Sequence, residues 1–459
     1  MSVVVTDDAW GATDERSELL FGLLRSGTYP RGLVRSERNF DLHRLSDSGG
    51  RPSEATSDEW LHLKRSTTPA YGVDIGVVEY RTATHEHQAV VSGREIADLA
   101  ARFGSALYAG DDATVHAKAD AELGLVAEAA GADLLITTKP ILVSPPVRLL
   151  RYTLALTPAE ALPIVGLYLR TQRTFIVERS RDFDDALHLN RGLLYWIATR
   201  ALLPAGWRWM SACMQQSSAS GDETLSWLST ALHTRVERAL RTLDHVKALT
   251  LRPQHNDVAD ETLEMLDLLL FSLAGAFDAS ALVAARTLDV DATPSRTSWQ
   301  HREFRGAIRH EHPALADIFA ADSASLALLR VLTDLRNSVH GEAISPMITS
   351  VQFERSKGLI VGLPRNRTDR LRNDFACLGG TAAWGVVELT PGRLFAQPDT
   401  LAHQLVVRCV AVLDDLLSAT PIDRLPLVDR ARIQSAPPRD DQLWSARTAE
   451  RVLWQMGLR

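Results

Sequence analysis

Cysteine is scarce in this sequence. Its three cysteines, Cys213, Cys377 and Cys409, are odd in number and lie far apart in a chain of 459 residues. A disulfide framework needs an even set of cysteines, and a zinc site built on CxxC pairs needs closely spaced thiols, so both are excluded. This cysteine content is typical of proteins in a reducing cytoplasm, which is the location that we expect.

The chain also lacks an excess of positive charge and an uninterrupted apolar run. It has 50 Lys and Arg residues against 57 Asp and Glu residues, a formal net charge of −7. That balance argues against a surface coated in positive potential for general nucleic-acid binding and leaves room for a local basic patch. The N-terminus shows no basic stretch before an apolar run, and charged residues interrupt the most apolar window, residues 263–288. We therefore expect no secretory signal and no membrane span.

Several motifs that carry nucleotide or hydrolase chemistry are missing as well. No GxxxxGK[ST], GxGxxG, GxSxG or HExxH occurs. The glycine-rich motifs cradle phosphates, GxSxG presents a nucleophilic serine, and HExxH binds zinc. We expect neither a nucleotide cofactor nor a metal from these patterns.

The first part of the chain contains alternating strand and helix patterns. The patterns predict helices over residues 15–25, after a cap at Ser92, after a cap at Asp112, and after Thr157-Pro158. They predict strands over residues 72–80 and 132–138, and an exposed loop over residues 44–57. Strand–helix–strand–helix order predicts an α/β domain over residues 1–175.

From residue 182 to residue 340 the pattern is nearly all helical. Apolar periodicity predicts helices over residues 184–203, 223–249, 258–288, 323–339 and 401–417, and short extended pieces over residues 358–363 and 384–389. We expect a helical connecting region over residues 176–252, a helical bundle with a small β insert over residues 253–436, and a tail helix over residues 437–459. The expected fold class is therefore α + α/β, with the α/β domain first.

The most informative segment lies at the end of the helix predicted over residues 323–339. Arg336 is suited to binding phosphate, and His340, four residues later, titrates near neutral pH. On a helical wheel centred on Leu332, both residues flank the apolar stripe rather than face open solvent. Such a position suits a groove between helices or between two protomers. The alternative is structural, because the helix macrodipole favours cations near a C-terminus and Gly341 is a good C-cap.

The segment Leu335-Arg336-Asn337-Ser338-Val339-His340-Gly341 resembles the signature of HEPN domains (higher eukaryotes and prokaryotes nucleotide-binding). These domains are small helical bundles whose arginine and histidine, with a polar residue after the arginine, meet across a dimer interface. In active members this composite site cleaves RNA without a metal ion. The resemblance covers residues 258–417 and is specific over these seven residues. Here three residues separate Arg336 from His340, one fewer than the family usually shows.

The resemblance implies a catalytic role for Arg336, Asn337 and His340. His340 would act as the base on a ribose 2′-hydroxyl or as the acid on the leaving 5′-oxygen. Arg336 would bind the scissile phosphate and stabilise charge on its equatorial oxygens, and Asn337 would orient one of these groups. Cleavage of this kind leaves a 2′,3′-cyclic phosphate and needs no cofactor. The implied partners are a second copy of the chain and RNA.

A second basic cluster precedes this segment. Arg302, Arg305 and Arg309 have spacings that place them on one helical face, where they would contact RNA phosphates. The alternative is an ordinary solvated helix face. His310-Glu311-His312 and His85-Glu86-His87 have HxH spacing, but neither has further ligands at sensible spacing, so we expect no metal site.

Residues 111–162 resemble the second half of a PIN-type nuclease domain. The resemblance rests on Asp120 in a helix, Asp133 at the start of a strand, Thr137-Thr138-Lys139 at its end, and residues 156–162. Helix and strand-end carboxylates of that family hold divalent metal ions for RNA hydrolysis. Asp74 is the nearest candidate for the acid after a first strand, whereas Lys139, where the family has an acid, would repel a metal ion. The resemblance therefore implies a nuclease-like scaffold without the activity, and the alternative is an unrelated α/β domain.

Three functions stay open at this point. The leading hypothesis is a HEPN-like, metal-independent endoribonuclease or RNA-binding effector of a bacterial defence or toxin system, active as a homodimer and regulated by its N-terminal domain. The second is a non-enzymatic helical dimerisation or scaffold protein, in which Arg336 and His340 stabilise a subunit interface beside a degenerate nuclease-like domain. The third is a metal-dependent nuclease that uses the N-terminal carboxylates.

Overall fold

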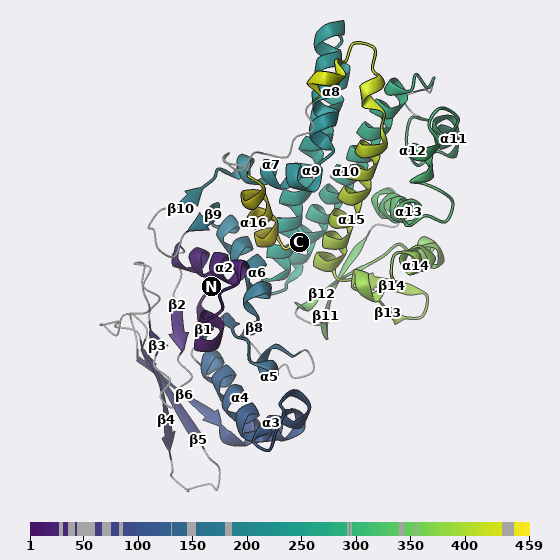
Figure 1. Ribbon diagram of the computed structural model, residues 1–459. Helices are drawn as coiled ribbons and strands as arrows, with labels where there is room; N and C mark the ends of the chain where they lie inside the picture. The colour runs from purple at the N-terminus through teal and green to yellow at the C-terminus, as the bar shows by residue number, and fades with distance from the viewer. Residues whose placement is uncertain are drawn as a thin grey trace. The chain divides into compact units, whose positions relative to one another are not determined.

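The chain is mostly helical with a few small sheets, as the sequence predicts (Figure 1). The computed structural model describes residues 1–26, 31–34, 42–43, 60–66, 75–81, 86–129, 131–144, 153–179, 186–291, 293, 296–338, 344–353, 356–433 and 445–459. The loop predicted over residues 44–57 lies outside them. The chain divides into two compact units, Met1–Asn190 with Arg451–Arg459, and Arg191–Glu450.

A five-stranded sheet in the order β3-β2-β1-β7-β8 forms the centre of the first unit. Its strands are β1 (Val3–Thr6), β2 (Arg31–Val34), β3 (Leu42–His43), β7 (Leu134–Ile136) and β8 (Leu154–Leu156), all parallel to their neighbours except β3. Val5 of β1 lies beside Leu33 on one side and Ile136 on the other. Near-continuous apolar runs of this kind suit parallel strands buried on both faces. The strand order reverses direction between β1 and β7.

Helices and two smaller sheets complete this unit. The helices are α1 (Asp7–Trp10), α2 (Glu15–Ser26), α3 (Gly93–Leu107), α4 (Ala113–Ala129), α5 (Pro140–Val143) and α6 (Pro158–Thr171). The smaller sheets are antiparallel: β4 (Trp60–Ser66), β5 (Ile75–Arg81) and β6 (Glu86–Ser92) form one, and β9 (Ile176–Arg179) and β10 (Ala186–His188) form the other. α6 begins as predicted, because Thr157 and Glu160 form a reciprocal capping box and Pro158 occupies the first turn.

The last helix, α16 (Ala446–Met456), contributes its final turns to the core of the first unit. Trp454 is buried in the cluster that contains Leu20 and Leu162, and an Arg170 nitrogen donates to the Gln455 carbonyl over 3.0 Å. α16 lies within the tail helix predicted over residues 437–459, and its Trp454 packs against residues of α2 and α6.

Replacing Trp454 with alanine is expected to lower the free energy of unfolding of the first unit by about 3–5 kcal/mol, because it removes a buried indole and leaves a cavity. The Arg16 guanidinium also loses the ring that it covers at 5.2 Å. Urea unfolding followed by circular dichroism measures the change. Trp227→Ala is the matched control, because Trp227 is 68% exposed. Equal effects of the two substitutions would contradict the placement of α16.

The second unit is built around long helices. They are α7 (Arg191–Leu202), α8 (Gly206–Ser220), α9 (Thr224–Thr250), α10 (Asn256–Thr287) and α15 (Pro398–Ala419), and α9, α10 and α15 pack side by side (Figure 1). Leu240, Leu273 and Leu405, one from each of the three, are fully buried. Length and composition alone would allow α10 to span a membrane, but 72% of its most apolar window is buried inside the protein, as in a core helix.

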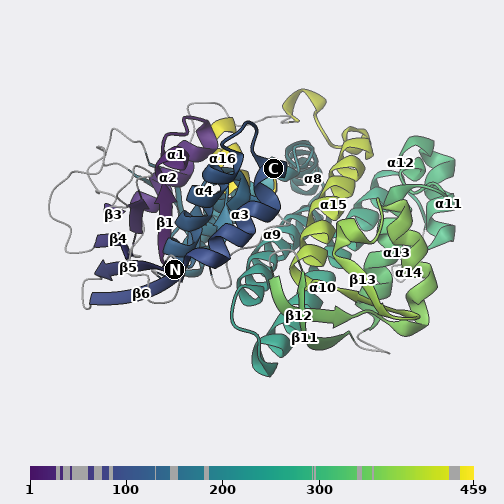
Figure 2. The ribbon, with the colours of Figure 1, turned by 90° about the horizontal axis from the view of Figure 1, so that it is seen from below.

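Shorter elements pack beside these helices. The helices are α11 (Arg302–Glu311), α12 (Pro313–Asp317), α13 (Ala324–Asn337) and α14 (Thr368–Cys377), with 3₁₀ turns at Arg365–Arg367, Ala382–Trp384, Ile422–Arg424 and Arg430–Arg432. An antiparallel sheet in the order β11-β12-β14-β13 contains β11 (Ser345–Phe353), β12 (Ser356–Gly362), β13 (Val386–Thr390) and β14 (Arg393–Ala396). Figure 2 shows α13 and α14 close to this sheet. Cys213 and Cys409 are buried, Cys377 is exposed, and all three are free.

The predicted helices agree with the structure in most places. Those predicted over residues 223–249, 258–288 and 401–417 are confirmed as α9, α10 and α15. The helix predicted over residues 184–203 is wrong at its start, because residues 186–188 form β10 and α7 begins at Arg191. α8 is not predicted, since Pro204-Ala205-Gly206 reads as a break. Gly206 is instead the first residue of α8, where an added Cβ would lie 2.6 Å from the His233 ring.

Candidate functional site

Arg336 lies at the last turn of α13. Ser323 caps the start of this helix by accepting a hydrogen bond from the Leu326 N–H over 3.1 Å. Leu328, Leu332 and Leu335 are buried, whereas Arg336 is half-buried and Asn337 is exposed. Arg336 therefore flanks the buried stripe, at the border that the helical wheel predicts.

The Arg336 guanidinium is held against an exposed apolar surface. It lies over the Phe271 ring of α10, 5.6 Å from the ring centroid, and one of its terminal nitrogens donates to the Asn337 side-chain oxygen over 3.1 Å. Its Nε is buried and has no hydrogen-bond partner among the residues that the structure describes. Phe271 is 40% exposed and Leu268, about one turn away, is 47% exposed. The terminal nitrogens, rather than the buried Nε, are therefore the donors that an anionic group beside this apolar face can reach.

His340 lies outside the described residues, whose nearest member is Ser338. α13 ends at Asn337, and the Ser338 hydroxyl donates to the Leu335 carbonyl over 2.5 Å.

Ion pairs between α13 and α14 fix the helix that carries Arg336. The Nε of Arg330 donates to Asp374 over 2.9 Å, and the Nε of Arg370 lies 3.3 Å from Asp334. Both carboxylates are buried, with side chains 4–5% exposed. Burial raises the pKa of the Asp334 carboxyl, and Arg370 and Arg367 oppose part of that rise. Buried charges of this kind are tolerated because each has an arginine partner.

The three arginines of α11 are in different environments. The guanidinium of Arg305 donates to the carbonyl of Trp299 over 2.5 Å and to that of Gln300 over 3.0 Å, so it stabilises the turn before its own helix. Burial lowers the pKa of Arg305, and Arg302 and Arg330 add to that effect. Arg309 pairs with Asp317 at 3.1 Å on the surface, and Arg302 is exposed.

His310 and His312, at the end of α11, each contact a different group of the protein. His310 Nδ1 lies 2.8 Å from Glu311, and His312 Nδ1 accepts from the Leu315 N–H over 3.3 Å. Within the described ranges no group of three or more His, Cys, Asp or Glu residues could hold a metal ion. His85 of the other HxH pattern lies outside those ranges.

Polar side chains of the first unit gather where the strand order reverses, at the ends of β1 and β7. Asp8 follows β1, and Thr138 and Lys139 follow β7. The Thr138 backbone N–H donates to the Asp8 carboxylate over 3.0 Å, and its hydroxyl donates to the same oxygen. In open α/β sheets, ligands bind outside the carboxyl ends of the strands at such a reversal. This cluster is therefore the second candidate site.

Lys139 supplies the positive charge in this cluster. Its ammonium lies 3.3 Å from Asp120 of α4, and the Tyr108 hydroxyl donates to the other Asp120 oxygen over 2.5 Å. Burial acts to raise the pKa of Asp8, but hydrogen bonds from Thr138 and Thr6, with the charge of Lys139, bring it below its usual value. The positive charge of Lys139 thus offsets the negative charges of Asp120 and Asp8, which would otherwise attract a metal cation.

Asp133 lies at the other end of β7. Its carboxylate accepts from the Ser2 backbone N–H over 2.6 Å and lies 3.7 Å from the N-terminal ammonium. The structure therefore does not bring Asp133 together with Asp120, whose partners follow the carboxyl ends of the strands. Asp74 lies outside the described residues.

Replacing Lys139 with alanine is expected to lower the free energy of unfolding of the first unit by about 1–3 kcal/mol, because Asp120 is left partly buried without its cation. Adding Asp120→Asn to that variant should restore part of the loss, since the uncompensated charge is removed. Lys139→Arg, which keeps the charge, is the control. Chemical denaturation of the three variants measures these changes. A Lys139→Ala protein as stable as the parent would contradict the role given to this ion pair.

No family model, curated protein or solved structure matches this chain. Function is therefore inferred from the geometry of the residues themselves and from the short resemblances in the sequence.

Sequence reasoning missed two groups of residues in these sites. Asp8 was detectable, because the β-branched run before it is typical of a first strand and Asp7-Asp8 directly follow. Phe271 and Leu268 give no such signal. They belong to a long apolar helix, and only the packing of α10 shows which of its residues stay exposed.

Proposed function

We propose that the second unit is a HEPN-like, metal-independent endoribonuclease. In the domain organisation that we propose, an N-terminal α/β domain with an inactive nuclease-like site precedes a HEPN-like helical bundle with a β insert. The observation that best supports the activity is the environment of Arg336. A half-buried guanidinium with one terminal nitrogen bonded to Asn337 and the other without a hydrogen bond to the described residues, next to an exposed apolar face, is suited to holding a phosphate.

The proposed chemistry needs only side chains of this chain. Arg336 binds the scissile phosphate and stabilises the charge that develops on its oxygens. His340, four residues later in the sequence, takes the proton from the ribose 2′-hydroxyl or gives one to the leaving 5′-oxygen. Attack of the 2′-oxygen on phosphorus breaks the bond to the 5′-oxygen and leaves a 2′,3′-cyclic phosphate and a 5′-hydroxyl. Asn337 orients Arg336 through the hydrogen bond between them.

A homodimer completes the proposed site. Leu268 and Phe271 form an exposed apolar face beside Arg336, and a second copy of the chain would remove that face from water. The protein would act in the cytoplasm as an effector of a bacterial defence or toxin system, with the first unit in a regulatory role. This biological setting comes from the HEPN resemblance alone.

The chemistry of the first unit favours this proposal over a metal-dependent nuclease. Lys139 already balances Asp120 and Asp8, so a divalent ion would have to displace an ion pair. A non-enzymatic dimerisation protein would use the same exposed face at Leu268 and Phe271. It would differ from the proposed nuclease because it would leave RNA intact.

RNA cleavage in EDTA tests the proposal. End-labelled single-stranded and structured RNAs are incubated with the parent protein, His340→Ala and Asp120→Ala. The expected result is cleavage in EDTA by the parent and Asp120→Ala, loss of cleavage in His340→Ala, and products that end in a 2′,3′-cyclic phosphate. Cleavage that needs Mg²⁺ and is lost in Asp120→Ala would overturn the proposal. Intact RNA with a stable dimer in every sample would favour the scaffold function.

A further inference from the structure

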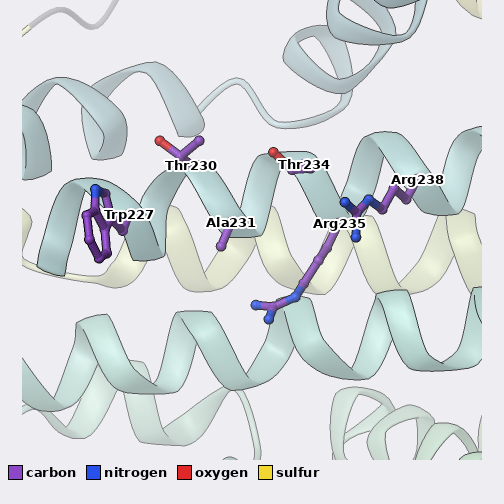
Figure 3. Close-up of a pocket in the computed structure, with 6 residues that line it drawn as sticks. All are labelled: Trp227, Thr230, Ala231, Thr234, Arg235 and Arg238. Carbon is purple, nitrogen blue, oxygen red and sulfur yellow. The ribbon is translucent and has the colours of Figure 1, made fainter.

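A shallow pocket of about 330 Å³ lies along the exposed side of α9. Its lining residues all come from this helix and recur at helical spacing, so they form one stripe: Trp227, Thr230, Ala231, Thr234, Arg235 and Arg238. Figure 3 shows Trp227 and Arg238 at the two ends of the stripe, with the threonines and Arg235 between them. The stripe is about 16 Å long, from the rise of an α-helix. We call it the α9 groove.

Trp227 is the most unusual residue of the α9 groove. It is 68% exposed, whereas Trp209, Trp299 and Trp384 are almost fully buried. An exposed indole keeps a large apolar area in contact with water and gains from any flat group that covers it. Nucleic-acid bases are flat groups of this kind, and single strands expose them.

Two arginines give the α9 groove its charge. Arg235 donates to the Gly275 carbonyl of α10 over 3.0 Å, which fixes its position and leaves its other nitrogens for a ligand. A Cβ at position 275 would lie 2.8 Å from Arg235 Nε, so the arginine side chain lies directly against this glycine. Arg238 is exposed, and its side chain has no ion pair or hydrogen bond with the residues that the structure describes. Phosphates would complement both charges.

The α9 groove leads toward Arg336. α9 and α10 are consecutive helices that pack side by side, and the Arg235–Gly275 contact shows which of their turns lie next to each other. Because the two helices are antiparallel, Arg238 lies near the level of Phe271, one turn before Gly275 in α10. Phe271 is the residue that the Arg336 guanidinium covers. Phe271 and Arg336 therefore lie nearer to the level of Arg238 than to that of Trp227, at the other end of the α9 groove.

We propose that the α9 groove binds single-stranded RNA, with a base stacked on Trp227 and phosphates on Arg235 and Arg238, and leads the strand toward Arg336. The inference rests on the proposed ribonuclease function for the choice of RNA. Thr230 and Thr234 add hydroxyls along the same side. Duplex RNA is not the ligand, because its bases are already stacked and unavailable to Trp227.

Binding of an oligonucleotide that cannot be cleaved separates this inference from the proposed activity. Fluorescence anisotropy of a labelled 2′-O-methyl single strand is measured with the full chain in EDTA. Trp227→Ala is expected to weaken binding about ten- to a hundredfold, whereas Trp227→Phe keeps most of it, because phenylalanine still stacks. Arg238→Ala should weaken binding and reduce the slope of log affinity against log salt by about 0.7, the value for one lost phosphate contact on a single strand.

Matched controls lie on neighbouring surfaces. Met214→Ala removes another exposed apolar side chain, and Arg252→Ala removes another exposed arginine, so neither should change binding. Parent-like affinity in Trp227→Ala and Arg238→Ala, equal affinity for duplex RNA, or no binding by the parent chain would each overturn the inference. A change of oligomeric state in Trp227→Ala with unchanged affinity would identify the groove as a subunit contact instead. Binding without cleavage would leave this inference standing and overturn the nuclease function.

Discussion

Replacing Arg336 with alanine is expected to slow RNA cleavage in EDTA by about 10²–10³-fold, the usual cost of removing a group that stabilises charge in the transition state. His340→Ala should slow it by about 10²–10⁴-fold, since a positioned acid or base contributes that much. Asn337→Ala should have a smaller effect, because Asn337 only orients the guanidinium over 3.1 Å.

First-order rates of cleavage under single-turnover conditions measure these effects. Arg336→Lys keeps the charge and loses the forked geometry, so a rate between those of the parent and the alanine variant is expected. Arg432→Ala is the control, because Arg432 is an exposed arginine paired with Asp429. If Arg336→Ala cleaves as fast as Arg432→Ala, the guanidinium has no part in the chemistry.

Replacing Arg330 with methionine is expected to lower the free energy of unfolding of the second unit by about 2–4 kcal/mol. Asp374 is 4% exposed and loses its closest cation, and Arg370 at 3.9 Å is a poorer partner. The same contact joins α13 to α14, so the position of Arg336 is expected to loosen and cleavage to slow as well.

Urea unfolding measures the stability change. Arg372→Met is the matched control, because the side chain of Arg372 in α14 is 41% exposed and pairs with Asp369 and Glu388 on the surface, and little change is expected. A second substitution, Asp374→Leu, in the Arg330→Met background should recover part of the stability by removing the unpaired charge. Equal effects of Arg330→Met and Arg372→Met would show that the buried carboxylate does not depend on this arginine.

Local sequence signals were sufficient for most helices of the second unit. α9 and α10 were predictable because their apolar residues recur at helical spacing over many turns, and Pro253 separates them. The start of α6 was predictable from Thr157, Pro158 and Glu160, since a capping box depends on neighbouring residues only.

Contacts between distant parts of the chain could not be predicted in this way. Thr138 donates to Asp8, 130 positions earlier, and no local pattern indicates that pairing. The helical spacing of Arg305 predicted that it would face RNA. Its guanidinium instead donates to carbonyls of the preceding turn, and a helical wheel does not include such contacts. The exposed face at Phe271 depends on which sides of α10 its neighbours cover. Sequence therefore predicted Arg336 at the border of a buried stripe but not what lies beside it.

A heterodimer of two inactive variants tests the composite active site most directly. Arg336→Ala and His340→Ala chains with different tags are co-expressed, and the mixed dimer is purified through both tags. If Arg336 of one protomer acts with His340 of its partner, one of the two sites is intact and cleavage in EDTA should reach about half the parent rate, while each variant alone stays inactive. A mixed dimer as inactive as the two single variants would contradict a site shared between protomers.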